Sequence, residues 1–202
     1  PQYKAIQNVN DKFKSTKLFG HRYLALKGNA IFNSASKRKL DAIQAQAIEN
    51  LTAKKGDAID GPTQREIDKE AMKILDEQVY TENVAKAKRL AEREGYNYYN
   101  FDTNKEAESQ VADIIADQLT DLENQGIDID SELSDGQTYR QYIEEQITET
   151  IDGIKDGSIN GFFDPVTNTQ YTFKENAIKN QKPNVPLHES AHQATIELIK
   201  KN

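Results

Sequence analysis

Three residues near the end of the chain have the types and the spacing that metal chemistry requires. They are His188, Glu189 and His192, in the segment His-Glu-Ser-Ala-His. On an α-helix, residues four apart lie on one face, so both imidazoles can reach one ion. Imidazole nitrogens suit Zn²⁺, which in catalytic sites keeps one position for water. The sequence therefore predicts a zinc site with His188 and His192 as ligands and Glu189 beside the ion.

The segment that carries these residues is predicted to be a helix. Leu187, Ala191, Ala194 and Leu198 recur at spacings of three and four, and this apolar stripe is expected to pack the helix. Pro186 falls in the first turn, where a missing N–H costs little. The chain has only three histidines. Two of them at this spacing, with a glutamate after the first, favour a metal site over coincidence.

A β-hairpin is expected shortly before this helix. Phe162 and Phe163 form one arm, and residues 170–173 form the other. Asp164 and Asn168 supply residues that favour a turn. The hairpin therefore leads towards the predicted metal helix and is expected to border its site.

The middle of the chain shows the periodicity of polar helices. Glycine, proline and capping residues divide it into predicted helices at about 36–55, 63–79, 81–94, 103–125 and 138–154. Thr63 with Glu66, and Thr103 with Glu106, form two capping boxes. The aromatic and amide cluster at 96–101 is either a short strand or a packed loop.

The predicted fold class is mostly α: a polar helical region, then a small β-hairpin and a C-terminal helix. Residues 1–35 are expected to be an irregular basic arm, 36–156 a helical docking region and 157–202 the hairpin with the metal helix. The change near residue 157 is the predicted domain boundary. Leu, Ile, Val and Phe make up only 44 of the 202 residues. Because this is low for a self-sufficient core, some helices are expected to pack on a partner.

Positive charge is concentrated at the start of the chain. Residues 1–40 carry nine Lys and Arg against one acid, Asp11, whereas the remainder carries 17 basic and 32 acidic residues. Such an arm could bind DNA or another anionic surface, dock on a protein, or pair with its own acidic helices. These alternatives stay open.

Two classes of protein are disfavoured by what the sequence lacks. The chain has no cysteine, which excludes a disulfide framework and a thiolate metal site. No apolar run approaches the ~20 residues needed to cross a membrane, and no signal-peptide pattern is present. The chain starts at Pro1, and its last helical pattern still runs at residues 200–202. We therefore expect a piece of a longer polypeptide and no membrane partner.

The segment 162–199 resembles the minimal zincin metallopeptidase domains that occur within very large proteins of tailed phages and mobile elements. In that family, a strand pair of the type Phe-Asp-Pro-x-Thr-x-Thr-x-Tyr and an Asn-containing turn precede the H-E-x-x-H helix. The chain shows this order in residues 163–171, then Asn176, then residues 188–192. The resemblance covers this last segment and leaves residues 1–155 without a counterpart.

The resemblance implies zinc-dependent peptidase chemistry. His188 and His192 would be zinc ligands, and Glu189 would be the general base for a water molecule. The hairpin arm at 170–173 would be an edge strand that aligns an extended peptide substrate.

The third zinc ligand of such enzymes is not visible in this pattern. Where the metzincin motif continues with a glycine and a histidine, the chain has Thr195 and Leu198. Glu197 follows His192 by five residues on the same helix and is too near to point at the ion. We therefore expect this chain alone to bind zinc weakly and to lack peptidase activity.

The resemblance also implies a setting. The chain would be a fragment of a large phage-type virion or cargo protein, located in the virion or the host cytoplasm, with other virion proteins as partners. One alternative is a structural helical component of an assembly, without catalysis, which suits the polar helices and the basic arm. A second alternative is a toxin or effector fragment of a mobile element.

Overall fold

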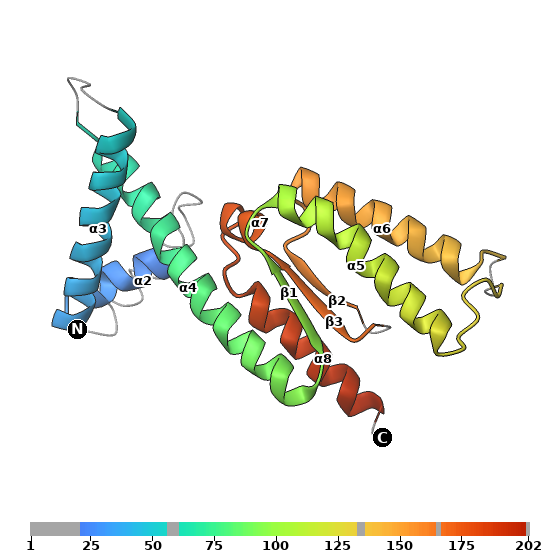
Figure 1. Ribbon diagram of the computed structural model, residues 1–202. Coiled ribbons are helices and arrows are strands. Elements are labelled where there is room, and N and C mark those ends of the chain that lie inside the picture. The colour runs from blue at the N-terminus through green and yellow to red at the C-terminus, as the bar shows by residue number, and fades with distance from the viewer. Residues whose placement is uncertain (1–20, 56–60, 133–135, 165–166, 201–202) are drawn as a thin grey trace. The chain divides into compact units, whose positions relative to one another are not determined.

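The structure, a computed structural model, describes residues 21–55, 61–132, 136–164 and 167–200. The chain is mostly helical and contains one three-stranded sheet (Figure 1). It divides into two compact units, residues 1–79 and 80–202. None of the described helices combines the length and the apolar character needed to cross a membrane.

The first unit is built from helices α2 (His21–Ala30), α3 (Ser34–Lys55) and the first half of α4 (Gln64–Glu94). Its core contains Tyr23 and Ile43, which are 0% and 2% exposed, packed with Ala47, Ala71 and Leu75. The sequence predicts an irregular arm over 1–35, but its described part is helical at 21–30. Helical propensity is weak there, so packing of Tyr23 into this core supplies the stability that the local sequence lacks.

One polar cluster in this unit uses part of the basic arm. The Tyr23 hydroxyl donates to Asp68 Oδ1 at 2.9 Å, and Lys27 Nζ lies 2.8 Å from the same carboxylate. Burial raises the pKa of Asp68, but hydrogen bonds from Lys27, Tyr23 and Gln64 outweigh it and lower the pKa. Lys27 therefore pairs with a helix of its own chain. This is one of the three roles that the sequence leaves open for the basic arm. Residues 1–20 lie outside the described part.

Helix α4 is a single helix of 31 residues, where the sequence predicts two. No glycine or proline interrupts residues 64–94, so nothing forces a break near Thr81. The predicted capping box at its start is confirmed. Thr63 N–H donates to Glu66 Oε2 at 2.7 Å, and Glu66 N–H donates to Thr63 Oγ1 at 3.3 Å.

The second unit holds the second half of α4 and the remaining elements. These are β1 (Asn97–Phe101), α5 (Asn104–Asn124), α6 (Tyr139–Asp156), β2 (Gly161–Asp164), β3 (Thr169–Phe173), α7 (Lys174–Lys179) and α8 (Val185–Lys200). The predicted hairpin is confirmed as β2 and β3, and the helix predicted for the H-E-x-x-H segment is confirmed as α8. Glu106 N–H donates to Thr103 Oγ1 at 3.2 Å, so the second predicted cap also forms.

The sheet has the strand order β1-β3-β2. Strand β1 pairs with β3 in parallel, with Asn97 opposite Thr169, while β2 pairs with β3 antiparallel, with Phe162 opposite Tyr171. The cluster at 96–101 is therefore mainly a strand. The prediction of an edge strand at 170–173 is wrong, because β1 occupies the other side of β3 and makes it the central strand. On its second edge, β2 pairs with no described strand.

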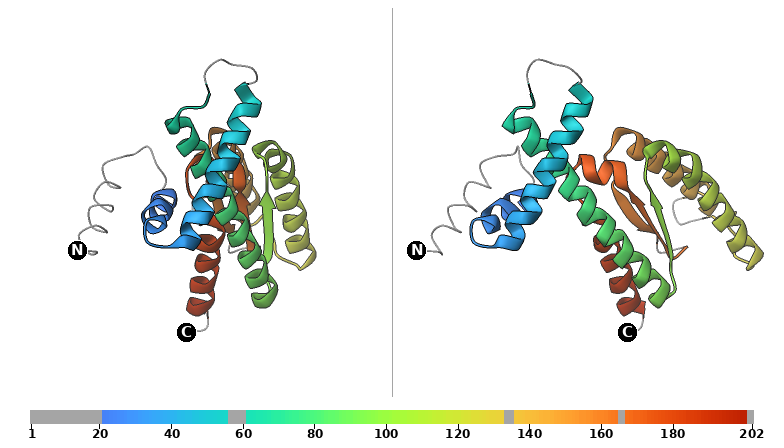
Figure 2. Two further views of the ribbon diagram at one scale, coloured as in Figure 1. Left: turned by 90° about the vertical axis from the view of Figure 1, so that its left-hand side faces the viewer. Right: turned by 60° about the vertical axis from the view of Figure 1, so that its left-hand side comes forward.

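Helices cover both faces of this sheet, with α5 and α6 on one face and α8 with the second half of α4 on the other (Figures 1 and 2). The α5–α6 face is aromatic: Phe101 stacks on Phe173 at 5.9 Å and Phe162 stacks on Tyr171 at 4.7 Å between ring centroids. The boundary predicted near residue 157 falls inside this unit, because α5 and α6 pack on the same strands that carry α8.

Candidate metal centre

The start of α8 is tied to the rest of the second unit by side-chain hydrogen bonds. Asn83 of α4 donates through Nδ2 to the Pro183 carbonyl at 2.9 Å and to Asn184 Oδ1 at 3.1 Å. The backbone carbonyl of Asn184 in turn accepts from the backbone N–H of His188 at 3.0 Å. The first ligand candidate therefore lies in a turn whose backbone is fixed from outside the helix.

Close packing fixes the other side of the same turn against the sheet. A Cβ atom placed on Gly161 would come within 2.6 Å of Val185 Cγ1 and 2.8 Å of the Tyr171 carbonyl oxygen. Only glycine lets β2 and α8 approach this closely. Val185 therefore marks the side of α8 that faces β2.

A buried polar cluster holds the middle of α8 on the central strand. The Ser190 hydroxyl accepts from the Tyr96 hydroxyl at 3.1 Å and lies 2.9 Å from both Gln170 Oε1 and the Pro186 carbonyl oxygen. Gln170, which is fully buried, donates through Nε2 to the same carbonyl at 2.7 Å. These bonds are directional, so they fix the rotation of α8 as well as its position.

The packing face of α8 differs from the predicted apolar stripe. The structure buries Val185, Pro186, Ser190 and Gln193, whereas Leu187 is half-buried and Ala191 is exposed. The side chains of residues 194–200 lie outside the described part. The difference arises because the sheet face below α8 presents the polar Gln170, which binds a polar helix face.

The ring nitrogens of the two histidines lie at a separation that is compatible with one ion. Their Nε2 atoms are 3.2 Å apart, and the ring planes meet at 88°. Two nitrogens on a tetrahedral Zn²⁺ at 2.0–2.1 Å would be about 3.3 Å apart. Both side chains are exposed, so an ion can reach them from solvent without any rearrangement of the core.

Glu189 lies beside the imidazole pair but in a drier environment. Its side chain is 9% exposed, and one of its oxygens lies within 4.8 Å of a ring nitrogen of each histidine. Burial raises the pKa of this carboxyl, and the nearby His188 and His192 lower it by less. A carboxylate with a raised pKa accepts a proton more readily, which suits a general base.

The imidazole pair shares one side of α8 with Val185. Residues 185, 188 and 192 lie on that side through spacings of three and four. Val185 approaches Gly161 of β2 and also packs in a cluster with Tyr80 of α4, whereas Ser190 on another side reaches Tyr96 before β1. The pair therefore lies on a side of α8 that carries a contact with β2.

The open edge of β2 has backbone groups suited to pairing. Phe173 N–H donates to the Asn160 carbonyl at 2.9 Å, so this pair is hydrogen-bonded across the strands. Hydrogen-bonded and non-hydrogen-bonded pairs alternate along an antiparallel ladder. The N–H and C=O of Gly161 and Phe163 therefore point away from β3, towards the open edge.

Within the described part of the chain, His188, Glu189 and His192 are the one group of three His, Asp or Glu residues whose ligand atoms converge. The structure thus brings together the three predicted site residues. The side chains of Thr195, Glu197 and Leu198 are not among those described, so the expectation for the third ligand stays a prediction.

The positioning residues Gln170, Tyr96 and Asn83 are not predicted from the sequence. Only Ser190, inside the H-E-x-x-H segment, carries a local signal. The others act over sequence separations of 20, 94 and about 100 residues.

Comparisons of the chain with protein-family models, with curated proteins and with solved structures found no match.

Proposed function

We propose that the chain holds a divalent metal ion, in the first place Zn²⁺, between His188 and His192, as part of a centre that hydrolyses peptide bonds. The observation that carries this proposal is the 3.2 Å separation of the two Nε2 atoms, on exposed rings next to a buried carboxylate. Imidazole nitrogens are donors that zinc accepts, and Glu189 lies beside them without being one of the proposed ligands.

The chemistry assigned to each residue follows from its place. A bound zinc ion supplies Lewis acidity, which polarises a carbonyl group and lowers the pKa of a water molecule. Glu189 would accept a proton from a water molecule at its carboxylate, a role that its raised pKa favours. An extended peptide would pair with the open edge of β2, the strand that Val185 of α8 approaches.

Zinc binding by the 202-residue chain tests this proposal directly. We expect one weakly held zinc per chain at saturation, measured by equilibrium dialysis over a range of free zinc concentrations. His188→Ala and His192→Ala should each abolish that binding, whereas Glu189→Gln should retain it. His21→Ala, which removes the third histidine of the chain, is the matched control and should bind as the unaltered chain does.

Substitution of cobalt for zinc gives a spectroscopic check. Tetrahedral Co²⁺ with nitrogen ligands absorbs strongly in the visible, and this band should appear in the unaltered chain and in Glu189→Gln but not in His188→Ala. Absence of stoichiometric metal, or equal binding by the two histidine variants and the unaltered chain, would refute the metal centre.

A second candidate function, as a structural component of a larger assembly, is favoured by one observation in the first unit. Ile31 and Phe32, between α2 and α3, are 71% and 63% exposed. Exposed apolar pairs of this kind are typical of contact sites. If they join copies of the chain, sedimentation should show concentration-dependent association that Ile31→Ser with Phe32→Ser removes. A monomer at all concentrations would contradict this role.

A further inference from the structure

A cavity of about 550 Å³ lies beside β2, on the face of the sheet opposite α8. Its apolar walls are Ile115 and Leu119 of α5 with Ile143 and Ile147 of α6, and Phe162 of β2 also lines it. This volume is within the range of ligand pockets, ~300–1,000 Å³. The cavity is much larger than a packing defect, so it can accept a large side chain.

The cavity and the open edge of β2 share one strand. Residues on neighbouring strands that stand opposite each other point to the same face of a sheet. A peptide strand added at this edge would therefore direct the residue opposite Phe162 towards the cavity. The residues on either side of it would point to the face that α8 covers.

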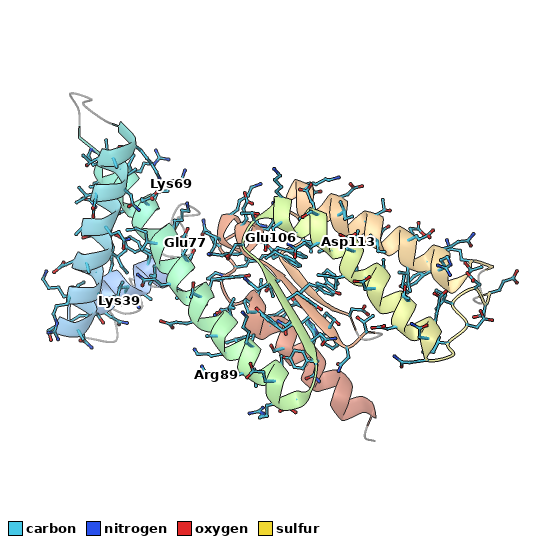
Figure 3. The ribbon with its side chains drawn as sticks, in the orientation of Figure 1. Lys39, Lys69, Glu77, Arg89, Glu106 and Asp113 are labelled. Atoms are coloured by element: carbon cyan, nitrogen blue, oxygen red, sulfur yellow. The ribbon has the colours of Figure 1, made fainter. Side chains whose placement is uncertain are left out.

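The helices beside the cavity are acidic, and one acidic side chain lines it. Helices α5 and α6 together carry eleven acidic and three basic side chains, of which Glu106 and Asp113 (Figure 3) lie on the side of α5 away from Ile115. Asp164, two residues after Phe162 on β2, is the acidic residue that lines the cavity. Opposite charges on neighbouring strands attract, so a basic residue suits the place opposite Asp164.

We propose that the edge of β2 and this cavity bind an extended peptide segment with a large apolar residue and a basic residue two positions away. The apolar side chain fills the cavity, the backbone pairs with Gly161 and Phe163, and the basic side chain faces Asp164. This inference rests on the proposed function for the role of the peptide as a substrate, but binding itself does not require the metal.

The test uses a short labelled peptide and the metal-free 202-residue chain. The probe is acetyl-Lys-Thr-Phe-Thr-Lys-amide, whose two lysines allow for either strand direction, with binding followed by fluorescence anisotropy in the presence of EDTA. Replacing its Phe by Ser should weaken binding at least tenfold, and replacing both Lys by Glu should weaken it further. N-methylation of the peptide backbone should also weaken binding, because it blocks strand pairing.

Two substitutions on α6 test the cavity from the protein side. Thr150 lines the cavity, and Thr150→Phe should fill it and weaken binding of the probe at least tenfold. Thr148 is exposed and lies on the same helix outside the cavity lining, so Thr148→Phe should leave binding unchanged. Because the peptide series uses the unaltered chain, it remains decisive even if Thr150→Phe fails to fold.

The outcomes separate this inference from the metal proposal. The probe is titrated in EDTA, so its binding does not depend on zinc, and loss of zinc binding alone leaves the peptide site standing. Equal affinity for the Phe and Ser peptides, or no binding at millimolar probe, would overturn the inference while leaving the zinc result untouched. Dimerisation that Thr150→Phe abolishes would assign the cavity to a second copy of the chain and overturn it as well.

Discussion

The two faces of the sheet in the second unit are packed by different means. On the α5–α6 face, Phe101, Tyr171 and Phe173 are nearly fully buried and stack with one another and with apolar helix residues. On the α8 face, Gln170 and Thr172 are equally buried, but they make hydrogen bonds. Alternate residues of one strand, β3, therefore supply both an apolar and a polar interface.

The two faces of the sheet have different roles: apolar packing stabilises the unit, and polar packing positions a helix. Apolar burial is large in free energy but has no preferred direction, so the aromatic face can stabilise the unit without defining the rotation of a helix. Hydrogen bonds contribute less to stability, about 0.5–1.5 kcal/mol each, but they require particular atoms to meet. We infer that the polar face orients α8 on the sheet.

The largest effect is expected on the aromatic face. Phe173→Ala should lower the free energy of unfolding by about 3–5 kcal/mol, because it removes a fully buried ring and leaves a cavity. Urea denaturation of the metal-free chain measures this loss. The matched change on the other face is Phe163→Ala, whose ring is half-buried and should cost less. Equal losses would contradict the division of roles between the faces.

A smaller loss is expected where α8 approaches the sheet. Gly161→Ala places a methyl group against Val185 and against the Tyr171 carbonyl oxygen, and the backbone contact cannot be relieved by a rotamer change. Overpacking of this kind costs about 1–3 kcal/mol, again measurable by urea denaturation. Gly61→Ala is the control, because a Cβ there meets no atom within 4 Å. A neutral Gly161→Ala would show that α8 is not held closely on β2.

The contrast between the faces also explains which features the sequence could predict. The hairpin, the capping box at Thr63 and the helix that carries the imidazole pair depend on residues close together in the chain, and all are confirmed. Of the box at Thr103, the bond from Glu106 N–H to the Thr103 hydroxyl forms, while the Glu106 carboxylate accepts from Asp102 N–H. The pairing of β1 with β3 joins residues about 70 apart, and no local pattern encodes it. Without β1, residues 170–173 could only be taken as an edge strand.

The packing face of α8 was mispredicted for a related reason. Periodicity arguments look for apolar residues and therefore select Leu187 and Ala191. The helix instead packs through Ser190 and Gln193, because the strand beneath it presents a polar side chain. A polar packing face can be identified only when its partner surface is known.

A substitution on the polar face should loosen the attachment of α8 to the sheet. Gln170→Leu removes the hydrogen bonds to Ser190 and to the Pro186 carbonyl, and should cost about 1–3 kcal/mol because buried groups lose a partner. Zinc affinity should change little, because both proposed ligands lie on α8 and move with it. Thr172→Val is the control: it loses hydrogen bonds to Tyr98 and Asn100 but none to α8. Hydrogen–deuterium exchange of α8 should rise in Gln170→Leu and not in Thr172→Val, and equal exchange in the two variants would mean that the polar face does not hold the helix.

The smallest effect is expected for Glu189→Gln in the metal-free chain. Burial raises the pKa of Glu189, so the folded chain binds this proton more tightly than the unfolded chain does. Its contribution to stability is then present below the ordinary glutamate pKa of ~4.3 and is lost as the pH rises through the raised value. At pH 7 the buried carboxylate is an unfavourable charge, and glutamine removes it.

Glu189→Gln should therefore be slightly more stable than the unaltered chain at pH 7, and the gain should disappear at pH 4. Urea denaturation in EDTA at the two pH values measures the difference. Glu92→Gln, at an exposed position on α4, should change stability by no more than ~0.5 kcal/mol at either pH. A destabilised Glu189→Gln at pH 7 would mean that the carboxylate makes favourable contacts in the metal-free fold. Glu189 would then be buried because it stabilises the packing of the polar face. Its assignment as a general base would fail.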